Sequence, residues 1–465
     1  MAMTASNPQT TSLWDIGAEE NSHGRDALTG DTSCDVLIVG AGYTGLWTAY
    51  YLTELAPHLR IVVAEAEHVG FGASGRNGGW LSHLLPGNRN VFARGPRGPE
   101  GLVAFQRAMV EAVDHVLDVS STRGLEIDAH RGGNLVVAPN EAGLQRLQAR
   151  HAADLRAGLT DEEVRLLTAG EVRERVDVVA AVGGLYAAPC ARIHPGKLVR
   201  QLARLVEARG VRLYEGTRVD RVEPRLAHTA SAQISTEHIL LCTEGFSGPL
   251  LGPRAVVPIR SSMIATQPLS AEEWSRIGWA NAECLSDTSH TFIYAQRTAD
   301  GRIALGGRGK PYEFASGIDG RHACHPDTQQ ALLDRLSLYF PDVHFEADYA
   351  WSGVLGVSRD WCASVRHDPR TGIGASVGYA GHGVAAANLA ARTLVDLVLA
   401  RDTDLVRLPL VDHRPPRWEP EPLRWAGIHA MYRLFRTADG REERRGATST
   451  SLIARFAGRL AGLAD

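Results

Sequence analysis

The spacing of hydrophobic positions changes several times along the chain, first after a polar stretch that covers residues 1–33. Residues 35–39 consist of Asp35 and four apolar residues, residues 46–55 carry apolar side chains at helical spacing, and residues 60–64 consist of Arg60 and a second apolar run of four. A short apolar run bounded by turn residues is typical of a buried strand. The pattern therefore predicts a parallel β-α-β unit at the start of the folded part.

The remaining pattern predicts a second kind of sheet and a helical end. Helical spacing is found at residues 102–119, 161–175, 194–208, 328–339 and 384–399, and strand patterns at 131–138, 183–188, 211–214, 217–222, 238–242, 255–265, 291–297, 301–307 and 349–353. The strands of 211–242 resume the first unit after an insertion, whereas the alternation over 255–307 indicates one broad, partly exposed sheet. Two helices of apolar residues and arginines in 403–465 are expected to dock onto the body, rather than onto a membrane surface or a partner.

These elements predict an α/β protein with a discontinuous nucleotide-binding domain and an inserted α+β domain. A tail covers residues 1–33, with residues 12–14 packed against the body. The predicted bounds are 34–100, 185–256 and 350–402 for the nucleotide-binding domain, 101–184 and 257–349 for the inserted domain, and 403–465 for a C-terminal helical extension.

Composition narrows the possible partners. A formal net charge of −4 gives no overall attraction to nucleic acid or to anionic membranes, so a charged substrate has to be bound locally. Six scattered cysteines form no Cys-x-x-Cys pair, which indicates reduced thiols and a cytoplasmic protein. His322, Cys324 and His325 offer soft ligands without a second cluster, so we predict no metal site. No apolar run is long enough for a signal peptide or a membrane span.

Three glycines, Gly40, Gly42 and Gly45, lie between the first predicted strand and the first helix. Glycines at this spacing allow a tight turn, and the N–H groups at the start of the following helix bind a pyrophosphate. Glu65 follows the second strand, where an acidic side chain accepts hydrogen bonds from the ribose of an adenosine. A glycine turn made for packing alone would not require that acid, so the sequence predicts a dinucleotide site.

Together these segments resemble the D-amino-acid-oxidase-like superfamily of FAD-dependent oxidoreductases, in particular the branch of γ-glutamylputrescine oxidase, glycine oxidase and sarcosine oxidase. The resemblance covers residues 34 to about 402 and implies a Rossmann-like FAD-binding domain and a substrate domain on a large mixed or antiparallel sheet. The glycine-rich segment 72–79 is similar to the family loop that passes close to the flavin and the pyrophosphate. Segment 378–383 is similar to the loop whose N–H groups face the flavin pyrimidine ring, where a helix N-terminus stabilises the charge of the reduced flavin.

The FAD-binding residues implied by this resemblance come from six stretches of the chain. They are Gly40, Ala41, Gly42, Tyr43, Thr44, Gly45, Glu65, Ala66, Gly72, Ala73, Ser74, Gly75, Arg76, Asn77, Gly78, Gly79, Val222, Thr243, Gly245, Gly378, Tyr379, Gly381, His382, Gly383 and Val384.

The resemblance also implies the reaction: a hydride passes from the carbon that bears a neutral amine to flavin N5, and water hydrolyses the resulting imine. The expected substrate is a small primary or secondary amine or amino acid, with dioxygen as acceptor, hydrogen peroxide as product and an arginine available for an anionic group. The side chains expected over the flavin are those of Trp80, His83, Arg260, Tyr294, Trp351, Arg359 and His382. A salt bridge or surface position is the alternative for both arginines, and a core position for Tyr294.

The sequence departs from the family pattern in two places, at Ala363, where relatives usually carry a proline, and at Ala304. Ala304 stands where sarcosine oxidases carry the lysine that activates dioxygen, so rapid oxidase turnover does not follow. Positions of covalent flavin attachment in relatives correspond here to Arg76, Asn77 and a segment around 351–353 without cysteine, so we expect non-covalent FAD. The alternatives are an NAD(P)H-dependent flavin monooxygenase, which usually has Gly-Asp before the late helix, and a flavoprotein subunit without turnover.

Overall fold

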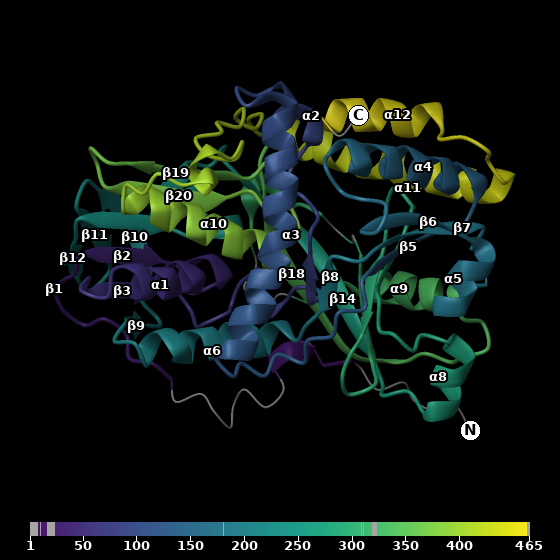
Figure 1. The fold of residues 1–465 in the computed structure, drawn as a ribbon, viewed down its shortest axis with the longest axis horizontal. Coiled ribbons are helices and arrows are strands. Elements are labelled where there is room, and N and C mark those ends of the chain that lie inside the picture. Colours follow the sequence, from purple (N-terminus) through teal and green to yellow (C-terminus); the bar gives the residue numbers. More distant parts are fainter. Residues whose placement is uncertain are drawn as a thin grey trace.

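Two β-sheets lie side by side in the molecule, with α3 (Gly98–Thr122) crossing the middle and α11 (Leu423–Arg445) and α12 (Leu452–Ala461) along one edge (Figure 1). The computed structural model describes residues 8–9, 11–15, 24–179, 181–307, 309, 311–318 and 323–462. None of the helices in these ranges is long and apolar enough to cross a membrane.

The first sheet has six strands, β2 (Val36–Val39), β3 (Ile61–Ala64), β9 (Arg212–Tyr214), β13 (His238–Leu241), β19 (Ser364–Asp368) and β20 (Ile373–Val377). Their order is β19-β20-β13-β2-β3-β9, and all neighbours are parallel except β19 and β20. Both faces of this sheet are covered, which explains why β2 and β3 read as unbroken apolar runs.

Helices cover one face of this sheet and a smaller sheet covers the other. Alternate residues such as Val36 and Ile38 pack against α1 (Tyr43–Leu55), α6 (Pro195–Glu207) and α10 (Gly383–Val398). Leu37 and Val39 face the opposite way, toward a four-stranded sheet. That sheet contains β1 (Thr32–Ser33), β12 (Gln233–Ser235), β11 (Leu226–Thr229) and β10 (Val219–Glu223), in this order.

The second large sheet has eight strands. In spatial order they are β18 (Ala347–Val357), β14 (Val257–Thr266), β17 (Ile303–Gly307), β16 (Tyr294–Arg297), β15 (Cys284–Asp287), β5 (Asn134–Ala138), β7 (Gly183–Ala187) and β6 (Val164–Thr168). Only the β5–β15 pair is parallel. One core cluster joins this sheet to α5 (Ala169–Arg175), α8 (Ala271–Ile277) and α9 (Pro326–Tyr339), and another joins it to α4 (Glu141–Arg156). The predicted α/β class with a large mixed sheet is confirmed.

Shorter elements connect these layers. They are β4 (Trp80–Ser82), which pairs with β8 (Cys190–Arg192), the helices α2 (Arg89–Arg94) and α7 (Gly248–Leu251), and the 3-10 turns η1 (Leu13–Asp15), η3 (Ala73–Gly75), η4 (Glu244–Phe246), η5 (Phe314–Ser316) and η6 (Asp404–Arg407). Trp14 in η1 is buried, as predicted for residues 12–14.

The predicted helix at 161–175 is wrong in its first half. Residues 164–168 form β6, the edge strand of the large sheet, because pairing with β7 outweighs their weak helical pattern. The helix begins only at Ala169, after the N-cap residue Thr168, whose side chain forms a capping box with Glu171. Sheet membership also shifts two of the predicted domain bounds, since β7 and the whole of β18 belong to the eight-stranded sheet, whereas the bounds at 185 and 350 cut through them.

The C-terminal extension docks onto the body, as predicted. The Trp418 indole N–H donates to the Val357 carbonyl at 2.8 Å, which fixes the segment before α11. Farther along, the Asp439 carboxylate accepts the backbone N–H groups of His290 and Thr291 at 2.7 and 2.9 Å. Because these contacts lie near the two ends of α11, the helix is held along its length.

Candidate functional site

The turn between β2 and α1 is shaped by backbone contacts. Gly40 has φ +106°, and its N–H donates to the Ala64 carbonyl at 2.9 Å. A Cβ at Gly45 would lie 2.0 Å from the Gly40 carbonyl oxygen, so only glycine fits where the helix passes the turn. Gly42 is the N-cap residue of α1 and carries no side-chain cap, so the N–H groups of the first turn, apart from that of Tyr43, which donates to Ser74, can bind a partner from outside.

Glu65 occupies the position predicted for it, at the carboxyl end of β3. Its carboxylate accepts the N–H of Ala41 at 2.7 Å and the N–H of Glu67 at 3.0 Å. Burial raises the pKa of this carboxyl group. Two fixed N–H donors orient the carboxylate beside the turn, where it can accept further hydrogen bonds from ribose hydroxyls.

A cavity of about 510 Å³ begins at this turn and reaches the eight-stranded sheet, and its volume is within the usual range for small-molecule sites. Sixteen of the predicted cofactor residues line it: Gly40, Gly42, Tyr43, Thr44, Glu65, Ala66, Gly72, Ala73, Ser74, Asn77, Thr243, Gly245, Tyr379, Gly381, Gly383 and Val384. Other predicted residues are not among the described lining residues, namely Ala41, Gly45, Gly75, Arg76, Gly78, Gly79, Val222, Gly378 and His382. In β10 the cavity is lined by Val219 and Asp220, whereas Val222 packs against the core cluster of the four-stranded sheet.

The loop at residues 72–79 lies across the start of α1. The Ser74 hydroxyl accepts the Tyr43 N–H at 2.9 Å and so contacts the first turn of the helix. Asn77 shapes the loop, because its side-chain amide donates to the Ala73 and Ser74 carbonyls and its oxygen accepts the Gly79 N–H. Arg76 donates to the carbonyl of Phe71, the residue before the loop, and therefore fixes the start of the loop.

Glu244, which the sequence analysis did not single out, fixes the glycine-rich loop at residues 378–383, the second glycine loop. Its carboxylate accepts the N–H groups of Gly378 and Tyr379 at 2.9 and 3.1 Å. The Tyr379 hydroxyl in turn lies 3.0 Å from the Thr44 hydroxyl on α1, so the second glycine loop contacts the helix that follows the Gly40–Gly45 turn. Burial raises the pKa of Glu244 to about 7.

Three of the side chains expected over the flavin, those of Tyr294, Trp80 and Arg260, lie on or beside the large sheet, but none of them is among the described lining residues of the cavity. The Tyr294 hydroxyl is 2.8 Å from the Ser261 hydroxyl. The Tyr294 and Trp80 rings pack edge to face, with 6.3 Å between their centroids. Arg260 is two residues along β14 from Pro258, which lines the cavity, so both side chains point to the same face of the strand. His382, the fourth, is the half-buried residue immediately before α10.

The other three expected side chains are likewise not among the described lining residues, and each has a partner elsewhere. Trp351 is fully buried and donates its indole N–H to the Arg76 carbonyl at 3.0 Å, so it supports the 72–79 loop. Arg359 pairs with Glu419 at 2.9 Å, because the C-terminal extension supplies a carboxylate that sequence spacing does not reveal. His83 is fully buried and contacts the Pro189 carbonyl at 3.0 Å.

The buried position of His83 predicts a pH effect on stability. Burial lowers the pKa of His83 to about 4 from 6.5, so the folded protein keeps this imidazole neutral while the unfolded chain protonates it below pH 6.5. As the pH falls from 6.5 to 4, the free energy of unfolding should therefore fall, by up to about 3 kcal/mol from this group. His83→Asn preserves a donor to Pro189 and should flatten the pH dependence of the free energy of unfolding, measured by urea unfolding. The exposed His58→Asn is the control, and an unchanged slope in His83→Asn would contradict the assignment.

The C-terminal extension also holds a loop at the mouth of the cavity. Ser316 and Ile318 line the cavity, and Tyr312 of the same loop donates its hydroxyl to Glu421 at 2.6 Å. The Ala315 N–H donates to the same carboxylate at 3.1 Å. The shape of the cavity therefore depends on residues outside the nucleotide-binding fold.

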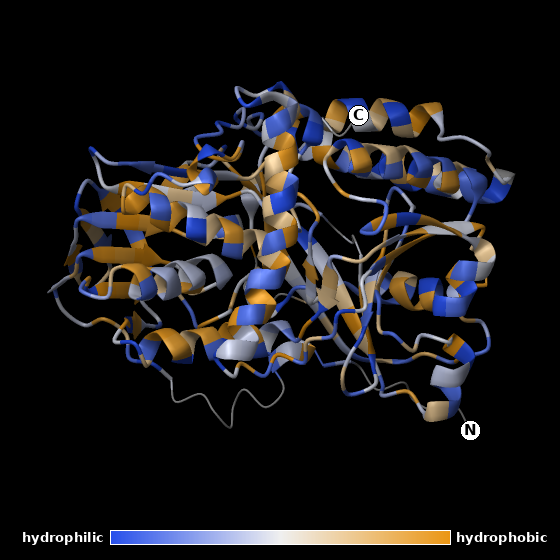
Figure 2. Ribbon diagram, viewed as in Figure 1, coloured by the Kyte–Doolittle hydropathy of each residue, from blue (hydrophilic) through white to orange (hydrophobic). Residues whose placement is uncertain are grey.

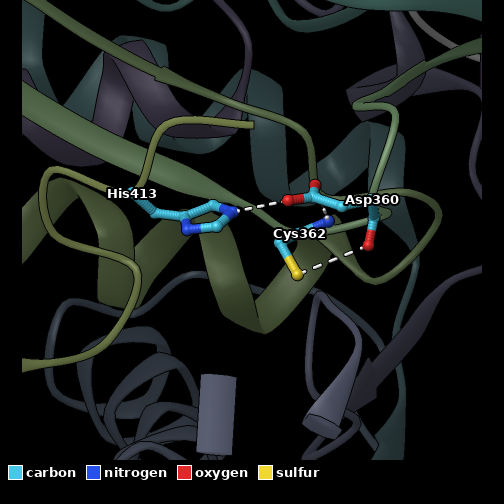
Figure 3. Close-up of side chains that lie close together, drawn as sticks. All are labelled: Asp360, Cys362 and His413. Atoms are coloured by element: carbon cyan, nitrogen blue, oxygen red, sulfur yellow. Dashed lines mark hydrogen bonds and ion pairs between the residues drawn. The ribbon is translucent and has the colours of Figure 1, made fainter. Parts of the chain in front are cut away.

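A cluster of Asp360, Cys362 and His413 joins the start of the extension to the body (Figure 3). Figure 3 shows the His413 imidazole pointing at the Asp360 carboxylate, 2.8 Å away, while the Cys362 thiol donates to the Asp360 carbonyl. These mutual hydrogen bonds account for the cluster as a structural contact. Of the ligands considered from sequence, Cys324 is buried, His325 caps α9, and His322 lies outside the described residues.

The residues present fit an FAD molecule. The start of α1 offers N–H groups and the 72–79 loop offers the Ser74 hydroxyl to a pyrophosphate, and Glu65 offers a carboxylate to a ribose. The second glycine loop brings the N-terminus of α10 to the cavity. Each contact in this set is supplied by a different segment of the chain, which is why the cavity forms only in the folded protein.

Comparisons with known proteins agree with this geometry. Residues 35–397 match the family model described as FAD dependent oxidoreductase (DAO). Over 382 residues the chain is 29% identical to γ-glutamylputrescine oxidoreductase of Escherichia coli (strain K12), which covers 80% of this chain and 85% of that protein. Among solved structures, glycine oxidase from Geobacillus kaustophilus superposes with a TM-score of 0.68 at 20% identity, over 82% of this chain and 99% of that one. Iminodiacetate oxidase from Chelativorans sp. BNC1 gives 0.63 at 19% identity, over 81% and 99%. The chain therefore belongs to the DAO family of FAD-dependent oxidoreductases.

Proposed function

We propose that the protein oxidises a carbon–nitrogen bond of a small primary or secondary amine or amino acid. The observation that supports the proposal is the cluster of Tyr294, Ser261 and Trp80 beside Gly78, which directly follows Asn77 in the lining of the cavity. A relative with 29% identity acts on γ-glutamylputrescine by its name, and structural neighbours include glycine and iminodiacetate oxidases.

When bound, FAD supplies the acceptor for the hydride that leaves the substrate carbon. The chain itself has to bind the amine in its neutral form, orient it and exclude water, since none of the described residues in this cluster forms a strong general base. Tyr294 and Trp80 offer two aromatic surfaces and a hydroxyl for this purpose. The imine product is then hydrolysed by water.

Arg260 is the candidate for an anionic group on the substrate. In this structure it pairs with Glu313 at 3.2 Å, and its side chain is only 14% exposed. An anionic substrate group would have to compete with Glu313 for the guanidinium. Glu313→Gln should therefore lower the KM for amines that carry a carboxylate while leaving the KM for neutral amines unchanged.

The reaction class is tested by mixing the purified holoenzyme with substrates under anaerobic conditions and following flavin absorbance. The panel contains amines, amino acids and aminophosphonates, with NADPH alone as the control for a monooxygenase. Rapid bleaching by one class of amine is the expected result. A flavin that stays oxidised with every amine but is bleached by NADPH or by another substrate class would overturn the proposal.

Glu244 should contribute to the affinity for FAD because it fixes the second glycine loop. Glu244→Gln keeps one acceptor but turns an N–H donor toward the other backbone N–H, so at least one hydrogen bond is lost. We expect FAD to bind about tenfold more weakly, measured by fluorescence titration of the apoprotein. Glu237→Gln, at an exposed position before β13, is the matched control. Equal affinities in both variants would show that the loop does not depend on Glu244.

Three finer properties belong to the same proposal. We propose that FAD is bound without a covalent link, and acid precipitation that leaves the yellow colour in the pellet would contradict this. Dioxygen is the proposed acceptor, although Ala304 is fully buried in an apolar cluster with Trp14 and Trp351 and offers no charge to activate it. A cytoplasmic location is proposed because all six cysteines are free and buried.

A further inference from the structure

The C-terminal extension lies beyond the residues that match the family, and its last helix forms an outer edge of the molecule (Figure 1). α12 packs against α11 and is fixed at both ends. The Ser451 N–H donates to Glu442 at 2.9 Å, and near the other end the Trp361 indole donates to the Ala461 carbonyl at 2.8 Å. The extension is therefore a firmly held surface.

The outward face of α12 carries a row of large apolar side chains. Leu452, Phe456 and Leu460 are 74%, 59% and 55% exposed, and their spacing of four residues places them in one line along the helix. The inward face is made of small residues, since Ala454, Ala457 and Ala461 are buried. Figure 2 shows hydrophobic and hydrophilic residues alternating along this helix. An exposed row of this kind marks an interaction site rather than scattered surface residues.

Arginines accompany the apolar row. Arg455 and Arg459 form the next line on α12, and the exposed arginines of α11 are Arg433, Arg436, Arg441 and Arg444. The acidic residues of α11 are used elsewhere: Asp439 and Glu442 are buried against the body, and Glu443 pairs with Arg335 at 3.1 Å. The outward faces of the two helices are therefore strongly basic, in a chain whose net charge is −4.

We propose that the outward faces of α11 and α12 bind the surface of an anionic lipid bilayer. Apolar side chains flanked by arginines are the pattern of helices that lie in the interface of a membrane, with the apolar row in the acyl boundary and the arginines at the headgroups. Two copies of this chain that met through the same faces would bring their arginines together, which disfavours a symmetric dimer. A nucleic acid would use the arginines but leave the apolar row unexplained.

The test uses the full-length holoenzyme and sedimentation with vesicles. Wild-type protein should pellet with vesicles of phosphatidylcholine mixed with phosphatidylglycerol and stay in solution with phosphatidylcholine alone. We expect Phe456→Ser/Leu460→Ser and Arg455→Glu/Arg459→Glu each to weaken binding by about tenfold or more, with flavin absorbance unchanged. Leu338→Ser on α9 and Arg366→Glu on β19 change equally exposed residues outside the extension and should bind as wild type does.

Several outcomes would overturn the proposal. Wild-type protein that stays in solution with both kinds of vesicle has no such surface. Binding that the two pairs of substitutions leave unchanged would place the lipid contact elsewhere. A dimer in light scattering that Phe456→Ser/Leu460→Ser dissociates, without any vesicle binding by the monomer, would assign the apolar row to a second copy of the chain.

Discussion

Replacing Gly45 by alanine is expected to abolish stable FAD binding, with a loss of affinity of about a hundredfold or more. The new Cβ would lie 2.0 Å from the Gly40 carbonyl oxygen and 3.1 Å from a methyl group of Ile38. The turn cannot yield easily, because the Gly40 N–H is bonded to Ala64 and the Ala41 N–H to Glu65. Overpacking of this kind costs about 1–3 kcal/mol, so the apoprotein should also lose stability. Fluorescence titration with FAD and thermal unfolding of the apoprotein measure the two effects.

Gly42→Ala is the informative comparison, because we propose that Gly42 serves the cofactor rather than the fold. Its backbone is extended, at φ −84° and ψ −173°, and a Cβ there would meet only the Ser74 hydroxyl, at 2.9 Å. The apoprotein should therefore keep its stability to within about 0.5 kcal/mol, while the methyl group weakens FAD binding at the helix N-terminus. If Gly45→Ala bound FAD as tightly as the wild type, the turn would not be the rigid element described here.

The parts of the site that could be predicted are those encoded within one segment. The glycine turn, the acid after β3 and the 72–79 loop each depend on neighbours in sequence, and the apolar runs of β2 and β3 follow directly from burial on both faces of the sheet. The strand β6 could not be predicted in this way, because its own pattern is weak and only pairing with β7 makes it a strand.

The parts that could not be predicted depend on partners far along the chain. Glu244 bonds a loop 134 residues away, and nothing in its own segment indicates that contact. From its sequence position Arg359 is a candidate substrate ligand, but in the structure it pairs with Glu419 of the extension. Trp351 is a candidate flavin contact, but its ring packs edge to face against Trp14. A motif specifies a residue type, but the residue's role depends on which group reaches it in the folded protein.

Replacing Gly306 by alanine is the second substitution with a large expected effect, and it acts on the substrate side of the proposed reaction. Tyr294 lies directly opposite Gly306 in the pair β16–β17, and a Cβ on Gly306 would lie 2.1 Å from its ring. The ring cannot move toward the 72–79 loop, because it already lies close to Gly78 there. A Cβ added at Gly78 would be only 2.8 Å from the ring. Tyr294 must therefore leave its place beside Ser261.

We expect the rate of anaerobic flavin reduction by the amine substrate to fall about a hundredfold in Gly306→Ala, with FAD still bound, because an orienting surface is lost. Gly307→Ala is the matched control, since the adjacent side chain position faces the opposite side of the sheet, and the one close neighbour of a Cβ there is the end of the Leu332 side chain, at 2.9 Å. Tyr294→Phe separates the hydroxyl from the ring, and a smaller loss there than in Gly306→Ala would assign the main effect to the position of the ring. Reduction at the wild-type rate in Gly306→Ala would remove Tyr294 from the substrate site and leave Arg260 and Trp80 to define it.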